Sequence, residues 1–177
     1  MRRVVIVGCT GSGKTTLAKR LSKKMNIPAT DLDDINWLPG WQERDHVEAC
    51  RMVTAEAQKP AWIICGNYSK FQELFLPQTD TLVWLDYSFP RNLCQLLLRS
   101  FLRLWRREVV CNGNVETWSK LLSRDSIVLW LFKTFRKNRQ KYSGLSALPP
   151  AGMTIVQHKN PKETERWLEA LIPTERA

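Results

Sequence analysis

Residues Gly8–Thr15, with the sequence GCTGSGKT, limit what this chain can fold into more than any other stretch. They match the phosphate-loop pattern G-x-x-x-x-G-K-[ST] at every fixed position. The apolar run Val4–Val7 directly before them predicts a strand, and the apolar periodicity of Thr15–Leu21 predicts a helix directly after them. A chance glycine-rich turn is the alternative, but it does not account for the strand and the helix. The pattern therefore predicts a P-loop α/β domain that holds a phosphate chain.

The loop residues have the chemistry that a phosphate chain and Mg²⁺ require. Glycines let the backbone turn so that its N–H groups point at the phosphates, at the positive end of the following helix. The Lys14 ammonium is expected to reach the β- and γ-phosphates, and the Thr15 hydroxyl is expected to bind Mg²⁺. The residues expected to contact the phosphate chain are Gly8, Gly11, Ser12, Gly13, Lys14, Thr15 and Thr16.

Length and cysteine usage narrow the class of protein. At 177 residues the chain suits one domain that buries a core without disulfides. The five cysteines are odd in number and form no C-x-x-C pair, so neither a disulfide framework nor a structural zinc site is expected. We therefore expect a cytoplasmic location. We expect no secretory signal and no membrane partner, because no apolar run approaches the roughly 18 residues of a membrane span.

The positive charge is concentrated in one segment. The chain has a net charge of +10, and residues 91–141 carry 12 Lys and Arg against 3 Asp and Glu, a net charge of +9. A basic segment can bind nucleic acid or an anionic membrane. An enzyme that transfers phosphate also needs cations around the moving group, so charge alone does not choose between these functions.

Strands alternate with helices along the chain, which is typical of the α/β class. Further strands are expected at residues 29–33, 61–65, 81–86 and 153–157, and a closing helix at residues 161–171. Ligands of parallel sheets gather where the strands end. The residues at four of these ends are Gly8, Asp33, Gly66 and Asp86.

Asp33 is the preferred catalytic acid. A carboxylate at the end of a strand beside the phosphate loop can orient an acceptor hydroxyl, take its proton or hold Mg²⁺ through water. Asp86 is a second candidate for the metal site. The alternative is that Asp33 and its neighbours Asp31 and Asp34 only cap and solvate a turn, and the same holds for Asp86.

Two tryptophans follow the acidic segment, in a stretch of residues 34–41 that reads as a loop. Trp37 and Trp41 can stack on a base or pack against a lid, because tryptophan offers a large ring with a polar edge. The alternative is that they form a satellite of the core. We expect them on the acceptor side of the site.

The basic segment is expected to form a helix at residues 91–107 and one or two helices at residues 115–142, with a break at 111–114. Arg99 and Arg103 are four residues apart, so they share one helix face and can clamp a phosphate together. Arg106 and Arg107 are equally compatible with a solvated surface.

Several motifs together resemble one known family. These are Gly8–Thr15, Leu32-Asp33 with Trp37–Trp41, Trp62–Tyr68, and Asp80–Asp86 with Pro90-Arg91. They are similar to successive motifs of the DNA topology modulation protein family, an adenylate-kinase-related branch of P-loop proteins. The resemblance covers most of the chain and is strong over the first ninety residues.

This resemblance implies a fold and cofactors. It implies a three-layer α/β/α sandwich with a five-stranded parallel sheet of order 2-3-1-4-5, and a helical lid over the phosphates. It implies one domain over residues 1–177, with residues 91–142 as the lid, and it implies ATP and Mg²⁺ as ligands.

The resemblance also implies roles for particular residues. Lid arginines, here Arg99 and Arg103, would contact the nucleotide and the transferring phosphate, with Arg136 and Arg139 on the far side of the lid. The segment at His158 would wrap the adenine. The loop that touches the phosphoryl acceptor corresponds here to Gly66, Asn67 and Tyr68.

One position departs from the family pattern. The family has an acid directly before Gly-Asn-Tyr, where this chain has Cys65. In related kinases that acid orders the water shell of Mg²⁺. Its absence transfers this duty to Asp33 or Asp86, or lowers catalytic competence.

Three functions are compatible with these observations. The favoured one is an ATP-dependent phosphotransferase with a small-molecule acceptor between Asp33, Trp37, Trp41 and Asn67. The second is a nucleic-acid-associated ATPase that uses the basic segment, but no known reading module supports it. The third is a GTPase-like switch, which lacks an N-K-x-D guanine motif. The acceptor and the oligomeric state are not predicted.

Overall fold

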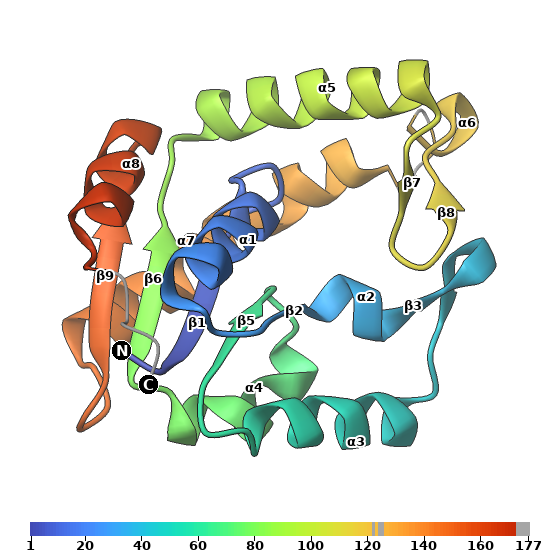
Figure 1. The fold of residues 1–177 in the computed structure, drawn as a ribbon. Coiled ribbons are helices and arrows are strands. Elements are labelled where there is room, and N and C mark those ends of the chain that lie inside the picture. The colour runs from blue at the N-terminus through green and yellow to red at the C-terminus, as the bar shows by residue number, and fades with distance from the viewer. Residues whose placement is uncertain (122, 124–125, 173–177) are drawn as a thin grey trace.

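A five-stranded parallel sheet forms the centre of the molecule (Figure 1). The structure is a computed structural model that describes residues 1–121, 123 and 126–172. The sheet strands are β1 (Arg3–Gly8), β2 (Ala29–Asp31), β5 (Trp62–Cys65), β6 (Thr81–Leu85) and β9 (Thr154–His158). They lie in the order β2-β5-β1-β6-β9, and every neighbouring pair is parallel. Numbered among themselves along the chain, they have the predicted order 2-3-1-4-5.

Helices surround the sheet, and two small hairpins extend from it. The helices are α1 (Lys14–Met25), α2 (Leu32–Asn36), α3 (His46–Ala57), α4 (Gln72–Phe75), α5 (Phe89–Arg106), α6 (Trp118–Leu121), α7 (Ile127–Ala147) and α8 (Pro161–Ala170). The hairpins are β3 (Trp37–Leu38) with β4 (Gln42–Glu43), and β7 (Val109–Val110) with β8 (Asn114–Val115). Short 3₁₀ turns lie at Pro39–Trp41, Ser69–Phe71 and Leu76–Gln78. None of the described helices is long and apolar enough to cross a membrane.

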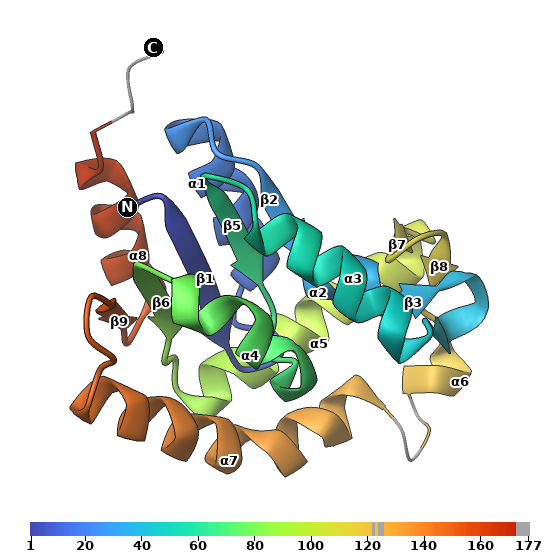
Figure 2. The same cartoon turned by 90° about the horizontal axis from the view of Figure 1, so that it is seen from below.

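Strand β1 shows why the fold has three layers. Its residues alternate between the two faces of the sheet, so both faces are apolar and both need a cover. Val4 and Ile6 pack with α1 and α8. Val5 and Val7 pack with α3 and α4 and with Tyr142 of α7. Figure 2 shows α1 and α7 on opposite sides of the sheet.

The predicted second strand ends two residues early. β2 stops at Asp31, and Leu32–Asn36 form α2, so Asp33 lies in a helix and not at the end of a strand. The reason is a capping signal, because the Asp31 side chain accepts a hydrogen bond from the backbone N–H of Asp33, at 3.0 Å. The predicted loop at residues 34–41 is therefore also wrong, since it contains most of α2 and strand β3.

The predicted lid segment, residues 91–142, corresponds to α5, the β7–β8 hairpin, α6 and most of α7. The predicted break at 111–114 is the turn of the hairpin. Residues 122 and 124–125 of the second expected helix lie outside the described residues, and α7 continues past the expected end to Ala147.

Asp80 ties the start of the chain to β6, and its removal gives a stability prediction. Its Oδ2 accepts hydrogen bonds from the backbone N–H groups of Arg2 and Arg3, at 2.7 and 2.8 Å. Burial raises the pKa of Asp80, but hydrogen bonds from Thr81 and from these N–H groups outweigh it and hold the pKa below its ordinary value. We expect Asp80→Ala to lower the free energy of unfolding at neutral pH by about 1–3 kcal/mol.

The pH dependence of this effect has a definite sign. A carboxylate whose pKa is lower in the folded state stabilises the fold above its unfolded pKa, and that stabilisation is lost as the pH falls through the folded pKa. The difference between Asp80→Ala and the parent should therefore shrink below a pH of about 4. Urea unfolding at a series of pH values measures it. A difference that stays constant with pH would show that the carboxylate charge is not involved.

Candidate active site

The loop between β1 and α1 is held tightly by its surroundings. Gly8, Gly11 and Gly13 have φ angles of 151°, 82° and 91°. A Cβ on Gly8 would lie 2.8 Å from the backbone oxygen of Leu85, and one on Gly11 would lie 2.6 Å from the backbone oxygen of Asn92. The loop is thus enclosed by β6 on one side and by α5 on the other, at distances that only glycine allows.

The open end of this loop carries hydrogen-bond donors that suit an anion. α1 begins at Lys14, and its N-cap, Gly13, provides no side-chain hydrogen bond to the first turn. The first-turn N–H groups of a helix have no partner within the helix, and they carry the positive end of its dipole. The Lys14 Nζ donates to the backbone oxygens of Gly8 and Cys9, at 3.0 and 3.1 Å, which holds the ammonium at the loop. Together these donors suit a phosphate chain.

Asp31 is a candidate site residue that the sequence did not indicate. The Thr15 hydroxyl donates a hydrogen bond to the Asp31 Oδ2, at 2.6 Å, while Oδ1 of the same carboxylate caps α2. The sequence pattern indicates only a turn at this residue. The signal that would have found it is its place as the last residue of β2, beside a strand that ends close to the phosphate loop.

The same carboxylate accounts for the departure at Cys65. Asp31 and Cys65 are partners in the register of β2 and β5. Burial and the neighbouring Asp31 raise the pKa of the Cys65 thiol well above its ordinary value, so this thiol is neutral and brings no charge to the site. An acid therefore stands next to the expected position, on the adjacent strand.

Asp33 is half-buried and has cations nearby. The Tyr68 hydroxyl donates a hydrogen bond to its Oδ1, at 2.6 Å. Burial and the neighbouring Asp31 raise the pKa of Asp33, and the positive charges of Lys14 and Arg99 act in the opposite direction. The structure thus brings together three predicted residues that are far apart in the sequence.

Gly66 allows Asp33 to come this close to the sheet. Its φ angle is 142°, and a Cβ at this position would lie 2.9 Å from the Cβ of Leu32. Because Gly66 has no side chain, Leu32 packs directly over the end of β5, and α2 carries the next residue, Asp33, to the carboxyl edge of the sheet.

The two predicted lid arginines have different surroundings. The Arg99 Nε is buried and has no hydrogen-bond partner among the described residues. Burial and the neighbouring Arg103 lower the pKa of Arg99, and the charge of Asp33 opposes them. Arg103 is instead paired with Glu116, at 2.9 Å, and lies 3.9 Å from Glu108. Arg99 therefore has an unused donor near Asp33, while Arg103 joins α5 to the hairpin.

Asn67 was predicted to bind the acceptor, and in the structure its amide forms hydrogen bonds with the backbone of Gly8. Its Oδ1 accepts from the Gly8 N–H, at 3.2 Å, and its Nδ2 donates to the Gly8 carbonyl, at 2.5 Å. Oδ1 also accepts from the Tyr142 hydroxyl of α7, at 3.3 Å. Both ends of the amide contact Gly8, so Asn67 positions the phosphate loop. A contact between its second Nδ2 hydrogen and an acceptor stays a prediction.

This arrangement gives a prediction for position 67. Asn67→Asp should weaken nucleotide binding by about tenfold to a hundredfold, because it removes the donor to Gly8 and places a negative charge beside the phosphate loop. Asn67→Ala, which removes the hydrogen bonds without adding a charge, should have a smaller effect. Titration with a fluorescent ATP analogue compares the two. Equal binding by the parent and both variants would contradict the positioning role.

Trp37 and Trp41 pack with each other and with the expected lid. Their rings form an edge-to-face pair with centroids 6.0 Å apart. The backbone N–H of Trp41 donates to the Asn114 Oδ1, at 2.7 Å, and its indole N–H donates to the Val115 carbonyl, at 3.3 Å. Of the two functional roles considered for the pair, contact with the lid is therefore the one that the structure shows for Trp41.

Asp86 and Arg139 are paired with each other. The Asp86 Oδ1 lies 3.1 Å from the Arg139 Nε, and its Oδ2 accepts from the Gln157 amide, at 2.9 Å. Each of its oxygens has a protein partner, and the metal-ligand role of Asp86 stays a prediction. The charges of Asp86 and Arg139 both affect the pKa of the buried Cys9 thiol, which indicates that the pair lies near the phosphate loop.

His158 lies within β9 and not after it. Its side chain is buried, and its ring packs against Trp167 of α8 with centroids 5.3 Å apart. Any contact with a base at this position would therefore come from the backbone near the end of β9, since the side chain belongs to the core.

The residues of this site fit a nucleotide phosphate chain with Mg²⁺. The glycine positions leave room that a Cβ would fill, and Arg99 has an orphaned buried donor. Within the described part of the chain, no group of three or more His, Cys, Asp and Glu side chains could hold a metal ion by itself. Mg²⁺ would thus depend on the Thr15 hydroxyl, phosphate oxygens and water, which is how this ion is usually bound.

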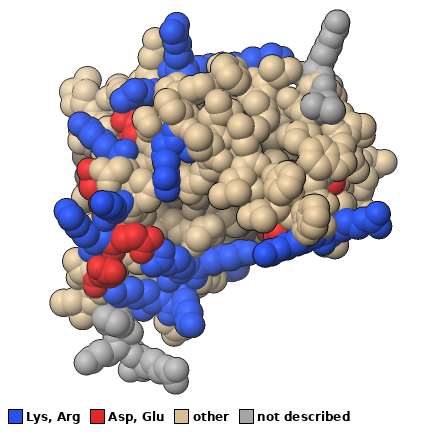
Figure 3. Space-filling model, turned by 90° about the horizontal axis from the view of Figure 1, so that it is seen from above, with Lys and Arg blue, Asp and Glu red and all other residues tan. Residues whose placement is uncertain are grey.

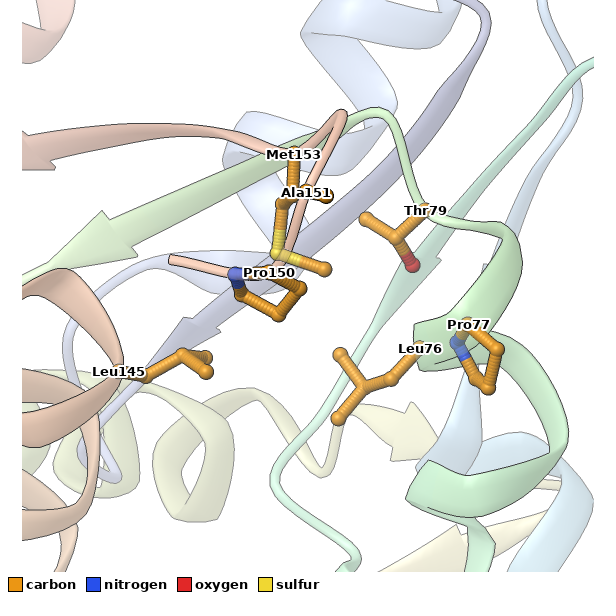
Figure 4. Close-up of a pocket in the computed structure, with 7 residues that line it drawn as sticks. All are labelled: Leu76, Pro77, Thr79, Leu145, Pro150, Ala151 and Met153. Atoms are coloured by element: carbon orange, nitrogen blue, oxygen red, sulfur yellow. The ribbon is translucent and has the colours of Figure 1, made fainter. Parts of the chain in front are cut away.

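Two hollows differ in their relation to the site. An open hollow of about 410 Å³ runs along α7 and is lined by Arg136, Arg139, Gln140 and Ser143, next to the Asp86 pair. The other is a cavity of about 270 Å³ at the amino ends of the strands, opposite the phosphate loop (Figure 4). It is lined by Leu76, Pro77, Thr79, Leu145, Pro150, Ala151 and Met153, so it is almost wholly apolar.

The fold is that of shikimate kinases. The enzyme from Acinetobacter baumannii in complex with shikimate superposes with a TM-score of 0.61 at 14% identity, covering 96% of this chain and 89% of that one. The enzyme from Bacteroides thetaiotaomicron gives 0.57 at 14% identity, with 95% and 94% covered. The enzyme from Aquifex aeolicus gives 0.53 at 16% identity, with 94% and 91% covered. No protein-family model matches this sequence, and no curated protein matches it.

Proposed function

We propose that this protein is a kinase that transfers the γ-phosphoryl group of Mg-ATP to a small acceptor with a hydroxyl or phosphate group. The observation that carries the proposal is the convergence of Lys14, Asp33 and Arg99 beside an uncapped helix terminus. Phosphoryl transfer requires cations around the moving group and a base at the acceptor, and these are the groups that converge.

Each residue has a distinct task in this reaction. The loop N–H groups and Lys14 bind the phosphates, and Thr15 and Asp31 hold the metal, Asp31 through water. Bound Mg²⁺ neutralises charge on the β- and γ-phosphates. Arg99 donates its free N–H to the transferring group, where negative charge is spread over the equatorial oxygens.

Asp33 serves as the base. Its carboxylate accepts the proton of the acceptor hydroxyl as the oxygen of that hydroxyl bonds to phosphorus and the bond to the β-phosphate oxygen breaks. The hydrogen bond from Tyr68 fixes the orientation of the carboxylate. Trp37, near Asp33 on the chain, and Tyr68 form the acceptor side, and the hollow lined by Arg136 and Arg139 is the proposed place of the base of ATP.

Two likenesses support this assignment. Proteins with this fold include shikimate kinases, one of them solved with shikimate bound, which is a small hydroxylated molecule. The motifs of the first ninety residues also resemble the DNA topology modulation protein family within the nucleoside and nucleotide kinases. We place this chain near that family and leave the acceptor to experiment.

A screen of ATP consumption tests the proposal. Candidate acceptors are nucleoside monophosphates, nucleosides and small hydroxylated metabolites including shikimate, with single- and double-stranded DNA as separate additions. We expect at least one small molecule to raise ADP formation well above the rate without acceptor, and the phosphorylated product to appear by mass spectrometry. Stimulation by DNA without any small-molecule product would replace the kinase by a nucleic-acid-associated ATPase.

A further inference from the structure

Helix α5 has an apolar face that points away from the protein. Its inner face is buried and consists of Asn92, Leu96, Ser100 and Leu104. The opposite side of the helix, here called the outer face, consists of Cys94, Leu97, Leu98, Phe101, Leu102 and Trp105. Leu98 is 62% exposed and Trp105 is 79% exposed. These positions recur at helical spacing, so the face is continuous over three turns.

Aromatic contacts extend this outer face beyond α5. The ring of Phe101 lies 6.3 Å from that of Trp105, nearly parallel to it. It also lies 6.4 Å from the ring of Trp118 on α6, in an edge-to-face arrangement, and Trp118 is itself 56% exposed. Single exposed apolar residues are normal, but a contiguous cluster of leucines and aromatic rings marks an interaction surface.

Positive charge surrounds this apolar surface. α5 and its C-cap contain five arginines and no Asp or Glu. Arg91 lies exposed at the start of the helix, and Arg106 and Arg107 lie exposed at its end. Figure 3 looks down on this side of the molecule, and shows a broad surface without charge whose margins carry many Lys and Arg and fewer Asp and Glu.

We infer that the outer face of α5 binds the surface of an anionic lipid bilayer. Leu98, Phe101 and Trp105 would enter the boundary between headgroups and acyl chains, and the arginines at both ends would contact the anionic headgroups. An amphipathic helix with leucine and tryptophan on one face and basic residues beside it has the composition of an interfacial helix. The helix would lie on the membrane, since no described helix is suited to cross one.

Charge and chemistry favour lipid over two other occupants. A second copy of this chain would bring the same arginines against Arg91, Arg106 and Arg107, and like charges would oppose the contact. Nucleic acid could pair its phosphates with the arginines, but the exposed leucines cannot stack on a base. The aromatic rings already pack against one another, which leaves less of their surface for stacking. An anionic bilayer satisfies both the apolar and the basic parts.

Co-sedimentation of the full chain with vesicles tests this inference. Vesicles of phosphatidylcholine alone are compared with vesicles of phosphatidylcholine and phosphatidylserine at a ratio of about 2:1. We expect binding to the mixed vesicles and little binding to the neutral ones, with a steep decrease at high salt. Equal binding to both compositions, or to neither, would overturn the inference.

Variants identify the surface that binds. The double variant Leu98→Gln/Trp105→Gln should reduce partition into the mixed vesicles by about tenfold or more, because it removes the inserted apolar groups. Arg106→Gln/Arg107→Gln should reduce it by roughly tenfold or more, since each basic residue near an anionic surface contributes about a fivefold effect. The matched control is Leu148→Gln, a change of the same kind at an 84% exposed leucine beyond α7. It should leave partition unchanged.

Three further measurements keep the outcomes distinct. Circular dichroism and thermal unfolding should show that the variants are folded, as expected for exposed positions. ATP turnover without vesicles should be the same in the parent and in Leu98→Gln/Trp105→Gln, so a failure of the kinase assignment would not affect this test. Light scattering tests for a dimer, and an oligonucleotide tests for nucleic-acid binding. If the parent shows either of these but does not bind vesicles, and Leu98→Gln/Trp105→Gln abolishes it, the outer face would belong to that partner and the inference would be overturned.

Discussion

The Asp33→Asn substitution is expected to lower kcat with a true acceptor by about 10²–10⁴-fold, the usual contribution of a general base. Asparagine keeps the size of the side chain and can still accept the hydrogen bond from Tyr68, but it cannot take a proton from the acceptor. Affinity for ATP should change little, because the phosphates are held by the loop. Asp34→Asn, at the neighbouring exposed carboxylate of α2, is the matched control and should leave kcat nearly unchanged.

The pH profile gives a second readout of Asp33. Burial and the neighbouring Asp31 raise its pKa, and a base must be deprotonated to act, so kcat/KM should fall as the pH decreases through a value above that of an ordinary aspartate. This acid limb should disappear in Asp33→Asn, whose remaining activity no longer depends on the carboxylate. Full activity of this variant, or an unchanged acid limb, would remove Asp33 from the mechanism.

The Lys14→Met substitution is expected to reduce phosphoryl transfer by about 10³-fold or more. The ammonium is held at the phosphate loop by the Gly8 and Cys9 carbonyls, and methionine matches the length of the chain without its charge. Loss of one preorganised cation at a developing negative charge has an effect of this size in related chemistry. Because Lys14 would also contact the phosphates of bound ATP in the proposed site, ATP affinity should fall as well.

A matched control isolates the effect of position. Lys19→Met, on the exposed side of the same helix, removes an equal charge away from the loop. We expect its kcat and KM for ATP to stay within about twofold of the parent, since exposed surface charges contribute little. Single-turnover measurements on the three proteins separate binding from chemistry. If Lys14→Met and Lys19→Met behaved alike, the loop would not be a catalytic phosphate site.

The sequence predicted the phosphate loop and the sheet correctly because both rest on local signals. The apolar run before Gly8 and the glycine spacing identify the loop, and apolar strands that alternate with helices identify a parallel sheet. Asp33 was predicted at this edge of the sheet from the position of the strand ends, whereas the place of Arg99 was implied by the family resemblance. Electrostatic effects of Lys14 and Arg99 on Asp33 agree with both.

The side-chain partners that the sequence did not indicate depend on contacts that local patterns do not contain. The sequence pattern of a carboxylate near the end of a strand does not show which group it contacts. Asp31 contacts Thr15, whereas Asp86 contacts an arginine. An asparagine in a loop reads as available for ligand, and only the register of β1 and β5 shows that Asn67 reaches Gly8. The apolar outer face of α5 was likewise hidden, because its residues resemble those of a core helix until the packing is known.

The pairing of Asn67 with Gly8 constrains how this protein can have changed over time. A side chain that satisfies both the N–H and the C=O of one residue must present a donor and an acceptor side by side in one plane. At neutral pH the amides of asparagine and glutamine do this from two atoms bonded to the same carbon. Glutamine is one methylene longer and would have to move the loop or the end of β5. Position 67 should therefore accept almost no substitution among descendants that keep an active loop. Its neighbour Tyr68 contacts Asp33 through one hydroxyl. Position 68 should therefore accept other residues in descendants where a different side chain donates a hydrogen bond to Asp33.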